Sequence, residues 1–421
     1  MPIAGLAKDS VVQKEGSVSV ETLVSEVLRN SPEILGAEAE LATAKGERRS
    51  ARQWKNPEVS AEYGEKRTSD RSTGELTGKG NAQQYSFSQT FEFPGKASLR
   101  KAIADHDVKL AELALQQLHL EVAAKARSLA VEWLATEQEA LTAREVADRS
   151  ETLTEMLKKR APAGVQSLLD QRIIEADLVN ILTHAREAEE RRDTARITLN
   201  LLRNHSPKDE LHLRASLDPL HSNTEWESLW ETAKASSFLI QSSEIELQKA
   251  GKSLSKAKVG AGPDITLSPF YSEERAADRE RILGIGVSLP LPLWDSNRGQ
   301  IEAARAGVKG ADARKAAVLR DLQRELAVAI AVYDLTAKQL EKTPLAMLTR
   351  LREGADLADR QFRLGAVPVQ TYIEMQDQYL QATSNLLNAI REAHDSLLKI
   401  RTLVSDPTLL GNPVKEESHA K

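Results

Sequence analysis

The chain contains no cysteine, and only 4% of its residues are aromatic. Without cysteine it can have no disulfide framework, no thiolate metal site, no cysteine nucleophile and no lipid on an N-terminal cysteine. No run of about 18 apolar residues occurs, so the sequence predicts no transmembrane helix. Residues 1–16 contain no apolar stretch of the kind found in signal peptides, so no signal peptide is visible.

Neither sign of charge is in large excess, because 62 acidic residues face 57 basic ones and the net charge is −5. Proteins that bind nucleic acid usually carry a basic excess, so this balance argues against a nucleic-acid partner. Glycine and proline are scarce, at 21 and 15 of 421 residues. Alanine, leucine, glutamate, glutamine, arginine and lysine predominate instead, which is the composition of long helices.

The sequence repeats itself at an offset of 206 positions, which brings Glu40 onto Glu246 and Pro57 onto Pro263. In both copies a helical pattern is followed by an alternating stretch, a polar loop, a second alternating stretch and a long helical hairpin. We therefore predict a disordered N-terminal segment, a first repeat, a linker, a second repeat and a disordered C-terminal tail, at residues 1–17, 18–204, 205–224, 225–405 and 406–421.

Each repeat contains two stretches in which apolar and polar residues alternate, the signal of a half-buried strand. We expect strands at about 57–64 and 83–93 in the first repeat, and at about 263–272 and 281–293 in the second. Polar loops, 65–82 and 272–280, separate the members of each pair. Stretches of 8–11 residues suit tilted strands that cross a bilayer, although an antiparallel hairpin in a soluble domain fits the alternation equally well.

The helical patterns predict two long antiparallel hairpins, 96–204 and 297–404, with breaks at 161–164 and 364–368. Apolar residues in the first long helix form two stripes, which predicts packing partners on both sides. Four strands cannot close a membrane barrel alone, since an open edge in lipid leaves backbone groups unpaired. Both features favour a cyclic oligomer.

Three motifs stand at corresponding places of the two repeats or at a hairpin tip: FPGK at 93–96, LPLPLWDSNRG at 289–299 and QFRLGAV at 361–367. Together with the doubled element order, they resemble the TolC family of outer-membrane efflux proteins over about residues 18–405. The FPGK turn is most similar to the heavy-metal (CzcC-like) branch of that family.

The resemblance implies a fold that is mainly α with a small membrane β-barrel contribution. A homotrimer would form a periplasmic α-barrel and a twelve-stranded β-barrel in outer-membrane lipid. It also implies an export duct that passively conducts substrate from a periplasmic adaptor (membrane fusion protein) and an inner-membrane RND-type pump to the outside. Heavy-metal cations and organic compounds both stay open as substrates.

The family's tunnel narrows at the hairpin tips, which makes Asp170 and Glu374 candidates for threefold rings of carboxylates that favour cations. Both could equally be ordinary acids on a helix surface. Some relatives hold the tunnel shut with a tyrosine and an arginine, where this chain has Phe362 and Val367. Any polar lock would therefore use other groups, such as Arg360 or Arg363 with Asp170.

The tips themselves consist largely of small and apolar residues, whereas solvated turns are usually polar. This composition predicts docking to the adaptor's helical tip, although a locally packed turn would also account for it. The candidate docking residues are Gly164, Val165, Leu364, Gly365, Ala366 and Val367.

No catalytic motif occurs, and the eight histidines are scattered, so we predict no enzymatic activity, no cofactor and no metal site. Two alternatives stay open at this point. A soluble coiled-coil scaffold could carry the strand pairs as a small platform domain. A periplasmic adaptor also has a long hairpin, but it should have one hairpin and more strands than this chain.

Overall fold

The structure is a computed structural model that describes residues 18–159, 165–214, 217, 224–276, 278–294 and 296–411, with only the backbone described at 165–167. The first repeat contains β1 (Val18–Ser19), α1 (Val20–Asn30), α2 (Pro32–Arg52), β2 (Glu58–Ser69), β3 (Leu76–Phe91), α3 (Lys96–Lys159) and α4 (Val165–Leu202). After β4 (Leu213–Arg214), the second contains α5 (Trp226–Ser236), α6 (Phe238–Gly260), β5 (Ile265–Arg275), β6 (Arg279–Ser288), α7 (Arg298–Lys342), α8 (Ala346–Arg363), α9 (Val369–Leu403) and the 3-10 helix η1 (Pro407–Leu410).

The chain forms two compact units, and each unit contains parts of both repeats. We call the first the helical unit; its described residues fall within 18–36, 116–238 and 320–411. The second, the sheet unit, comprises described residues of 37–115 and 239–319. In neither unit does a described helix combine the length and the apolar character that a bilayer crossing needs.

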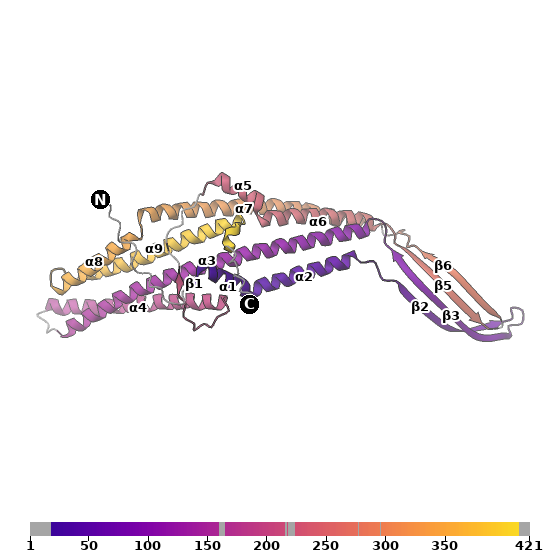
Figure 1. Cartoon of the computed structure of the whole chain (residues 1–421), viewed down its shortest axis with the longest axis horizontal. Helices are drawn as coiled ribbons and strands as arrows, with labels where there is room; N and C mark the ends of the chain where they lie inside the picture. Colours follow the sequence, from indigo (N-terminus) through magenta and orange to yellow (C-terminus); the bar gives the residue numbers. More distant parts are fainter. Residues whose placement is uncertain are drawn as a thin grey trace, which may run out of the picture. The chain divides into compact units, whose positions relative to one another are not determined.

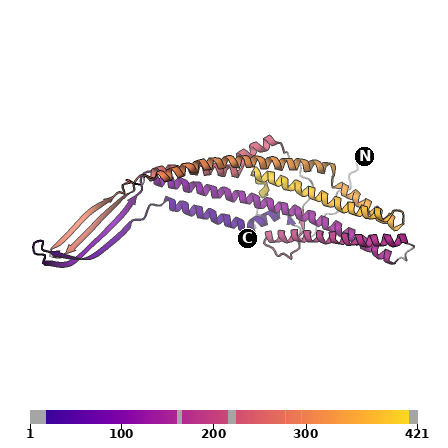
Figure 2. The same ribbon diagram turned by 180° about the vertical axis from the view of Figure 1, so that it is seen from behind.

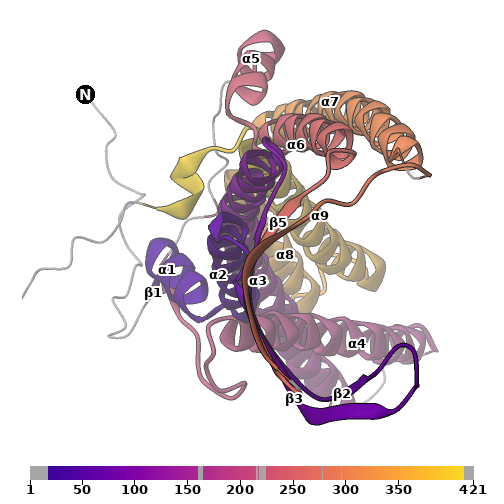
Figure 3. The same cartoon turned by 90° about the vertical axis from the view of Figure 1, so that its right-hand side faces the viewer.

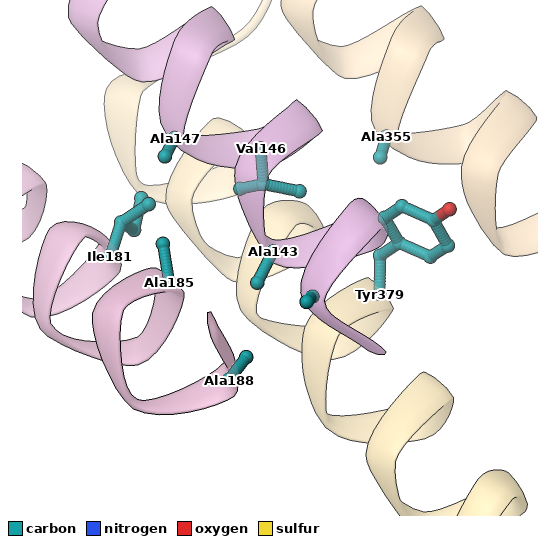
Figure 4. Packing of buried hydrophobic residues seen from close by; sticks show 9 residues of the cluster. Ala143, Val146, Ala147, Ile181, Ala185, Ala188, Ala355 and Tyr379 are labelled. Carbon is teal, nitrogen blue, oxygen red and sulfur yellow. The ribbon is translucent and has the colours of Figure 1, made fainter. Parts of the chain in front are cut away.

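The helical unit packs α3, α4, α8 and α9 through small side chains. Figure 4 shows one such cluster, in which Ala143 and Ala147 of α3 face Ile181 and Ala185 of α4, and Tyr379 of α9 lies beside Ala355 of α8. Alanine allows the helix axes to approach closely while the faces still exclude water. Helices α8 and α9 lie side by side in both views (Figures 1 and 2), and Gln376 Nε2 of α9 donates to the Ala355 carbonyl at 3.0 Å.

The segment after α9 differs from the expected disordered tail, because residues 406–411 are built into the helical unit. Asp406 caps η1 by accepting from the Thr408 amide, and Leu409 is fully buried beside Leu120 and Leu398. The guanidinium of Arg127 donates to the Leu409 carbonyl at 3.1 Å. One buried leucine in a short polar segment gives no periodic signal, which is why the sequence pattern did not indicate this contact.

The sheet unit holds one antiparallel sheet in the order β2-β3-β5-β6. Its central pair, β3 with β5, joins the strands of the first repeat to those of the second. From the side, in Figure 3, the sheet is a single curved layer.

The strands differ in extent from the sequence expectation. Most of the expected polar loop 65–82 is strand, since β2 runs to Ser69, β3 begins at Leu76, and only the turn 70–75 separates them. Likewise β5 and β6 extend through most of the expected loop 272–280. Backbone pairing can continue where both side-chain faces are polar, and such a stretch has no apolar alternation to reveal it. At the other end β6 stops at Ser288, because Pro290 and Pro292 have no N–H to donate.

The helices of the sheet unit are held together by ion pairs between neighbours. Arg52 of α2 contacts Asp105 of α3 at 3.0 Å, and Lys249 of α6 contacts Asp107 of α3 at 2.5 Å. Asp264, just before β5, accepts from the Phe93 amide at 3.0 Å and from Lys96 Nζ at 2.8 Å. The FPGK turn is thus tied to the start of the second repeat's first long strand.

Candidate functional site

The sheet has two chemically different faces. Two residues that pair directly across neighbouring strands project from the same face of the sheet. The pairs Val59–Phe87, Tyr85–Tyr271 and Leu267–Val287 all project from one face, which is apolar. This apolar face is exposed: Val59 is 79%, Leu283 84% and Ile285 73% accessible. An exposed apolar surface of this extent marks a site that is covered by membrane lipid or by another protein.

The opposite face is mostly polar, with Phe270 and Ile282 as its apolar members in β5 and β6. Ser60 and Ser86 share a hydrogen bond between their hydroxyl oxygens at 2.7 Å, and Thr90 and Thr266 do so at 2.9 Å. Gly284 alternates with the apolar residues of β6, and the space that its missing side chain leaves on this face is taken by the ring of Phe270. Small and hydroxylated side chains in these positions suit contact with water.

Strands β2 and β6 form the two edges of the described sheet, with 12 and 10 residues respectively. Each edge presents backbone N–H and C=O groups that pair with no other described strand. Edges of this length require a partner, since unpaired backbone groups are costly away from water.

The tip between α8 and α9 is built from the motif QFRLGAV. Gly365 has φ +74°, and the Ala366 amide donates to the Gln361 carbonyl while the Gly365 amide donates to that of Phe362, both at 2.9 Å. This is a Schellman ending, which satisfies the last carbonyls of α8 and favours glycine at the left-handed position. Leu364 is left 79% exposed at the turn.

The tip is anchored to the helix beside it by aromatic and ionic contacts. Phe362 stacks on Tyr372 at 5.5 Å between ring centroids, and the hydroxyls of buried Tyr372 and Ser150 lie 3.1 Å apart. Arg149 of α3 contacts Asp356 of α8 at 2.5 Å. Phe362 therefore supports the turn by packing.

The expected gate residues lie on three helices of the helical unit. Glu374 is exposed on the second turn of α9, and Asp170 is partly exposed near the start of α4. Arg363 donates to Asp359 of its own helix at 2.8 Å, and Arg360 is exposed one turn earlier. The contact predicted between Asp170 and one of these arginines stays a prediction.

The other tip is only partly described. Gly164 lies outside the described residues, and Val165 is described by its backbone as the first residue of α4. Of the docking residues, the structure therefore gives side-chain surroundings only at the α8–α9 tip, where Ala366 is exposed and Val367 is partly exposed.

A cleft of about 730 Å³ opens between α3, α4 and α9, and two acids that the sequence reading missed line it. Burial, and then the negative charge of Asp377, raise the pKa of Asp177 to about 6. Burial also raises the pKa of Asp377, against the opposing effect of His184. Two neighbouring carboxylates repel each other in their charged forms, so the less exposed of the two, Asp177, holds a proton more readily.

Helical spacing could have indicated these two residues. Asp177 follows Asp170 by seven residues, and Asp377 follows Glu374 by three, so each pair lies on one helix face. Both helices thus carry a row of two acids. No group of three or more histidine, aspartate or glutamate side chains in the described part of the chain is placed to hold a metal ion. The arrangement can attract cations but offers no chelating site there.

Comparison with known proteins agrees with this architecture. The family model described as "Outer membrane efflux protein" matches residues 23–205 and 229–405, one match per repeat. This decides against the soluble scaffold and the periplasmic adaptor. A curated relative, the cobalt-zinc-cadmium resistance protein CzcC of Cupriavidus metallidurans, is 23% identical over 388 residues, which cover 91% of this chain and 89% of the relative.

Solved structures share the fold at low identity. The outer-membrane channel CmeC of Campylobacter jejuni superimposes with a TM-score of 0.75 at 14% identity, over 96% of this chain and 93% of CmeC. The open-state outer-membrane channel MtrE of Neisseria gonorrhoeae gives 0.73 at 14% identity, over 92% and 88%. With both repeats matched, the chain is an outer-membrane channel for efflux and belongs to the outer membrane efflux protein family.

Proposed function

We propose that this protein works as a homotrimer and forms the outer-membrane duct of a tripartite system that exports heavy-metal cations. The sheet carries the proposal, because its apolar face suits lipid, its polar face suits water, and its edges need partners. Three copies joined from β6 to β2 would close a barrel of twelve strands, within the range of outer-membrane barrels. Strands β5 and β6, with 11 and 10 residues, are long enough to cross.

The mass of the particle in detergent tests this assembly. Native mass spectrometry of the detergent-extracted protein should give three chains. A stable monomer in water without detergent would contradict the proposal, since a single chain would then have satisfied both its edges and its apolar face.

The choice of cargo rests on charge and on the relative named for cobalt, zinc and cadmium resistance. Asp170, Asp177, Glu374 and Asp377 repeat three times in a trimer, and rings of acids at a constriction favour cations. In a host that lacks its own duct but retains the pump and adaptor, expression of this chain should restore tolerance to zinc, cobalt and cadmium salts. Restored tolerance to organic compounds alone would contradict the metal assignment.

Docking at the tips is the second part of the proposal. The α8–α9 turn presents the exposed apolar side chain of Leu364 beside Gly365 and Ala366, whose small side chains leave backbone accessible to a partner. A helical adaptor tip with a matching apolar turn could pack there with few polar groups to desolvate. The energy for export would come from the inner-membrane pump, since the duct itself is passive.

A further inference from the structure

At the turn end of the strands, the apolar face of the sheet passes into a strongly cationic surface. We call this surface the arginine rim; it comprises the charged residues that continue the apolar face in β2, β3, β5 and β6. Register places five basic and two acidic side chains there, namely Arg67, Lys79, Arg275, Arg279 and Arg281 with Glu65 and Glu273.

Three of these arginines gather around a single carboxylate. Glu273, whose side chain is 6% exposed, accepts from Arg275 at 2.6 Å and from Arg279 at 2.7 Å, and Arg281 lies 3.8 Å from its other oxygen. The hydroxyl of Tyr271 donates to the same carboxylate at 2.9 Å. Glu273 is thus saturated, and its one negative charge cannot neutralise three guanidinium groups.

The remaining positive charge points outward. The side chains of Arg275, Arg279 and Arg281 are 60%, 48% and 54% exposed, and Glu273 is their only ion-pair partner among the residues described in the sheet unit. Each guanidinium carries five donors, so several N–H groups per arginine are available to a further anion. The glutamate holds the arginines together without exhausting their charge.

The opposite face at the same level has the reverse balance. Lys66 contacts Glu274 and lies 3.5 Å from Glu280, so one cation faces two carboxylates there. The cationic excess therefore belongs to the face that bears the apolar residues, and the two surfaces are continuous. Tyrosines mark the transition, with Tyr63, Tyr85 and Tyr271 between the apolar band and the rim, as in the aromatic girdles of membrane barrels.

We propose that the arginine rim binds the phosphate groups of the glycolipid in the outer leaflet, lipopolysaccharide, and so fixes the depth of the channel in the membrane. This inference rests on the proposed spanning orientation. The argument for this occupant is charge complementarity together with continuity: a molecule whose acyl chains cover the apolar face presents its phosphates at the height of the rim. Arginine donors in a fixed fork match phosphate oxygens bidentately.

The rim can be tested by removing charge while Glu273 keeps one partner. The double variant Arg279→Gln/Arg281→Gln retains Arg275, and Arg279→Lys/Arg281→Lys retains the charge. Arg320→Gln/Arg324→Gln removes two exposed arginines of α7 as a matched control. Binding of lipid A with two phosphates to the detergent-solubilised protein is measured by native mass spectrometry, in parallel with dephosphorylated lipid A, phosphatidylcholine and inorganic phosphate.

We expect wild type and the α7 control to bind two-phosphate lipid A on the order of tenfold more tightly than Arg279→Gln/Arg281→Gln does, and the lysine variant, which keeps the charge but loses the fork, to bind with intermediate strength. Dephosphorylated lipid A should bind to all four proteins equally and weakly, and millimolar inorganic phosphate should not displace the lipid. Equal binding by wild type and the glutamine variant, or no preference for phosphate in wild type, would overturn the inference.

Displacement of lipid A by inorganic phosphate would also overturn it, because the rim would then be a site for small anions. The mass of the particle separates this inference from the proposed function. If wild type is a trimer without phosphate preference, only the rim assignment fails. If it is a water-soluble monomer, the spanning orientation fails and the rim assignment with it.

Discussion

Asp177 and Asp377 show how packing changes the chemistry of single residues. They occupy helix positions at which the sequence alone indicates solvated acids, and the cleft between α3, α4 and α9 removes part of their water. An aspartate whose pKa is about 6 in the folded protein holds a proton between about pH 4 and 6 that the unfolded chain releases. Its charged form thus opposes folding above pH 6, and this penalty disappears as the pH falls towards 4.

Asp177→Asn should therefore stabilise the protein at pH 7.5 and have almost no effect at pH 4. After allowance for solvent screening of a half-buried group, we expect about 1 kcal/mol at pH 7.5. Thermal unfolding in detergent at several pH values measures the difference. Asp148→Asn, at an exposed position of α3, is the control and should show no comparable gain at high pH. A difference that grows as the pH falls would contradict the assignment.

Glu374 tests the proposed selectivity of the tip. Glu374→Gln removes one negative charge per chain while the side chain keeps its shape, so cation selectivity and divalent block in planar-bilayer recordings should fall about twofold at low salt. In 1 M salt, where the Debye length is about 3 Å, the difference should nearly vanish.

Glu392→Gln is the matched control for this experiment. It lies 18 residues further along α9, which is five helical turns, so it shares the helix face of Glu374 but lies far from the tip. A much smaller effect is expected there. Equal effects of the two substitutions would place the selective constriction elsewhere, and Glu374 would then be an ordinary surface acid.

Among the elements, the α8–α9 turn is the part of the proposed docking surface whose side chains the structure describes most fully. Leu364→Glu places a charge on the exposed apolar side chain of the turn without disturbing the Schellman hydrogen bonds, which are made by the backbone. Binding of the cognate adaptor, measured by cross-linking in cells, should fall about tenfold, since a buried unpaired carboxylate costs over 1 kcal/mol.

Gln370→Glu is its control, because it adds the same charge at an exposed, already polar position of the first turn of α9. Both variants should retain the trimer in detergent. Normal adaptor binding by Leu364→Glu would show that the turn is a locally packed cap and no docking surface.

An element could be predicted from the sequence where its apolar residues recur at regular spacing. The two hairpins and the alternating halves of the strands follow from apolar spacing, which backbone geometry imposes directly. The halves of the strands nearest the turns were missed because both of their faces are polar, so apolar and polar residues do not alternate. The short helix after Asp406 was missed because one buried leucine produces no periodic pattern of apolar residues. The acids of the cleft were missed for another reason, because the environment that raises their pKa values arises only when α4 packs near α9.

At the scale of the whole molecule, the doubled sequence explains why one chain supplies a two-faced sheet with two open edges. Each repeat contributes one hairpin, and β3 pairs with β5 across the repeats. A closed assembly of identical chains turns these edges into interfaces, which is the usual solution for a heterologous contact that must not grow into a filament. In the proposed trimer each tip would occur three times, so the acidic side chain of each copy would become part of a ring of three.

The orientation of the assembly can be tested with single cysteines, since the natural chain contains none and every thiol introduced is unique. Ser72 lies in the turn between β2 and β3, where its amide donates to Asp70 at 2.7 Å; cysteine keeps this donor. Ala366 lies exposed at the helical tip.

In intact cells a membrane-impermeant maleimide should label Ser72→Cys strongly, and Ala366→Cys at least tenfold less, because the outer membrane separates the reagent from the periplasm. In permeabilised cells both thiols should react, which shows that Ala366→Cys is accessible once the barrier is removed. Equal labelling in intact cells would place both ends of the protein on the same side of the membrane and contradict the spanning arrangement.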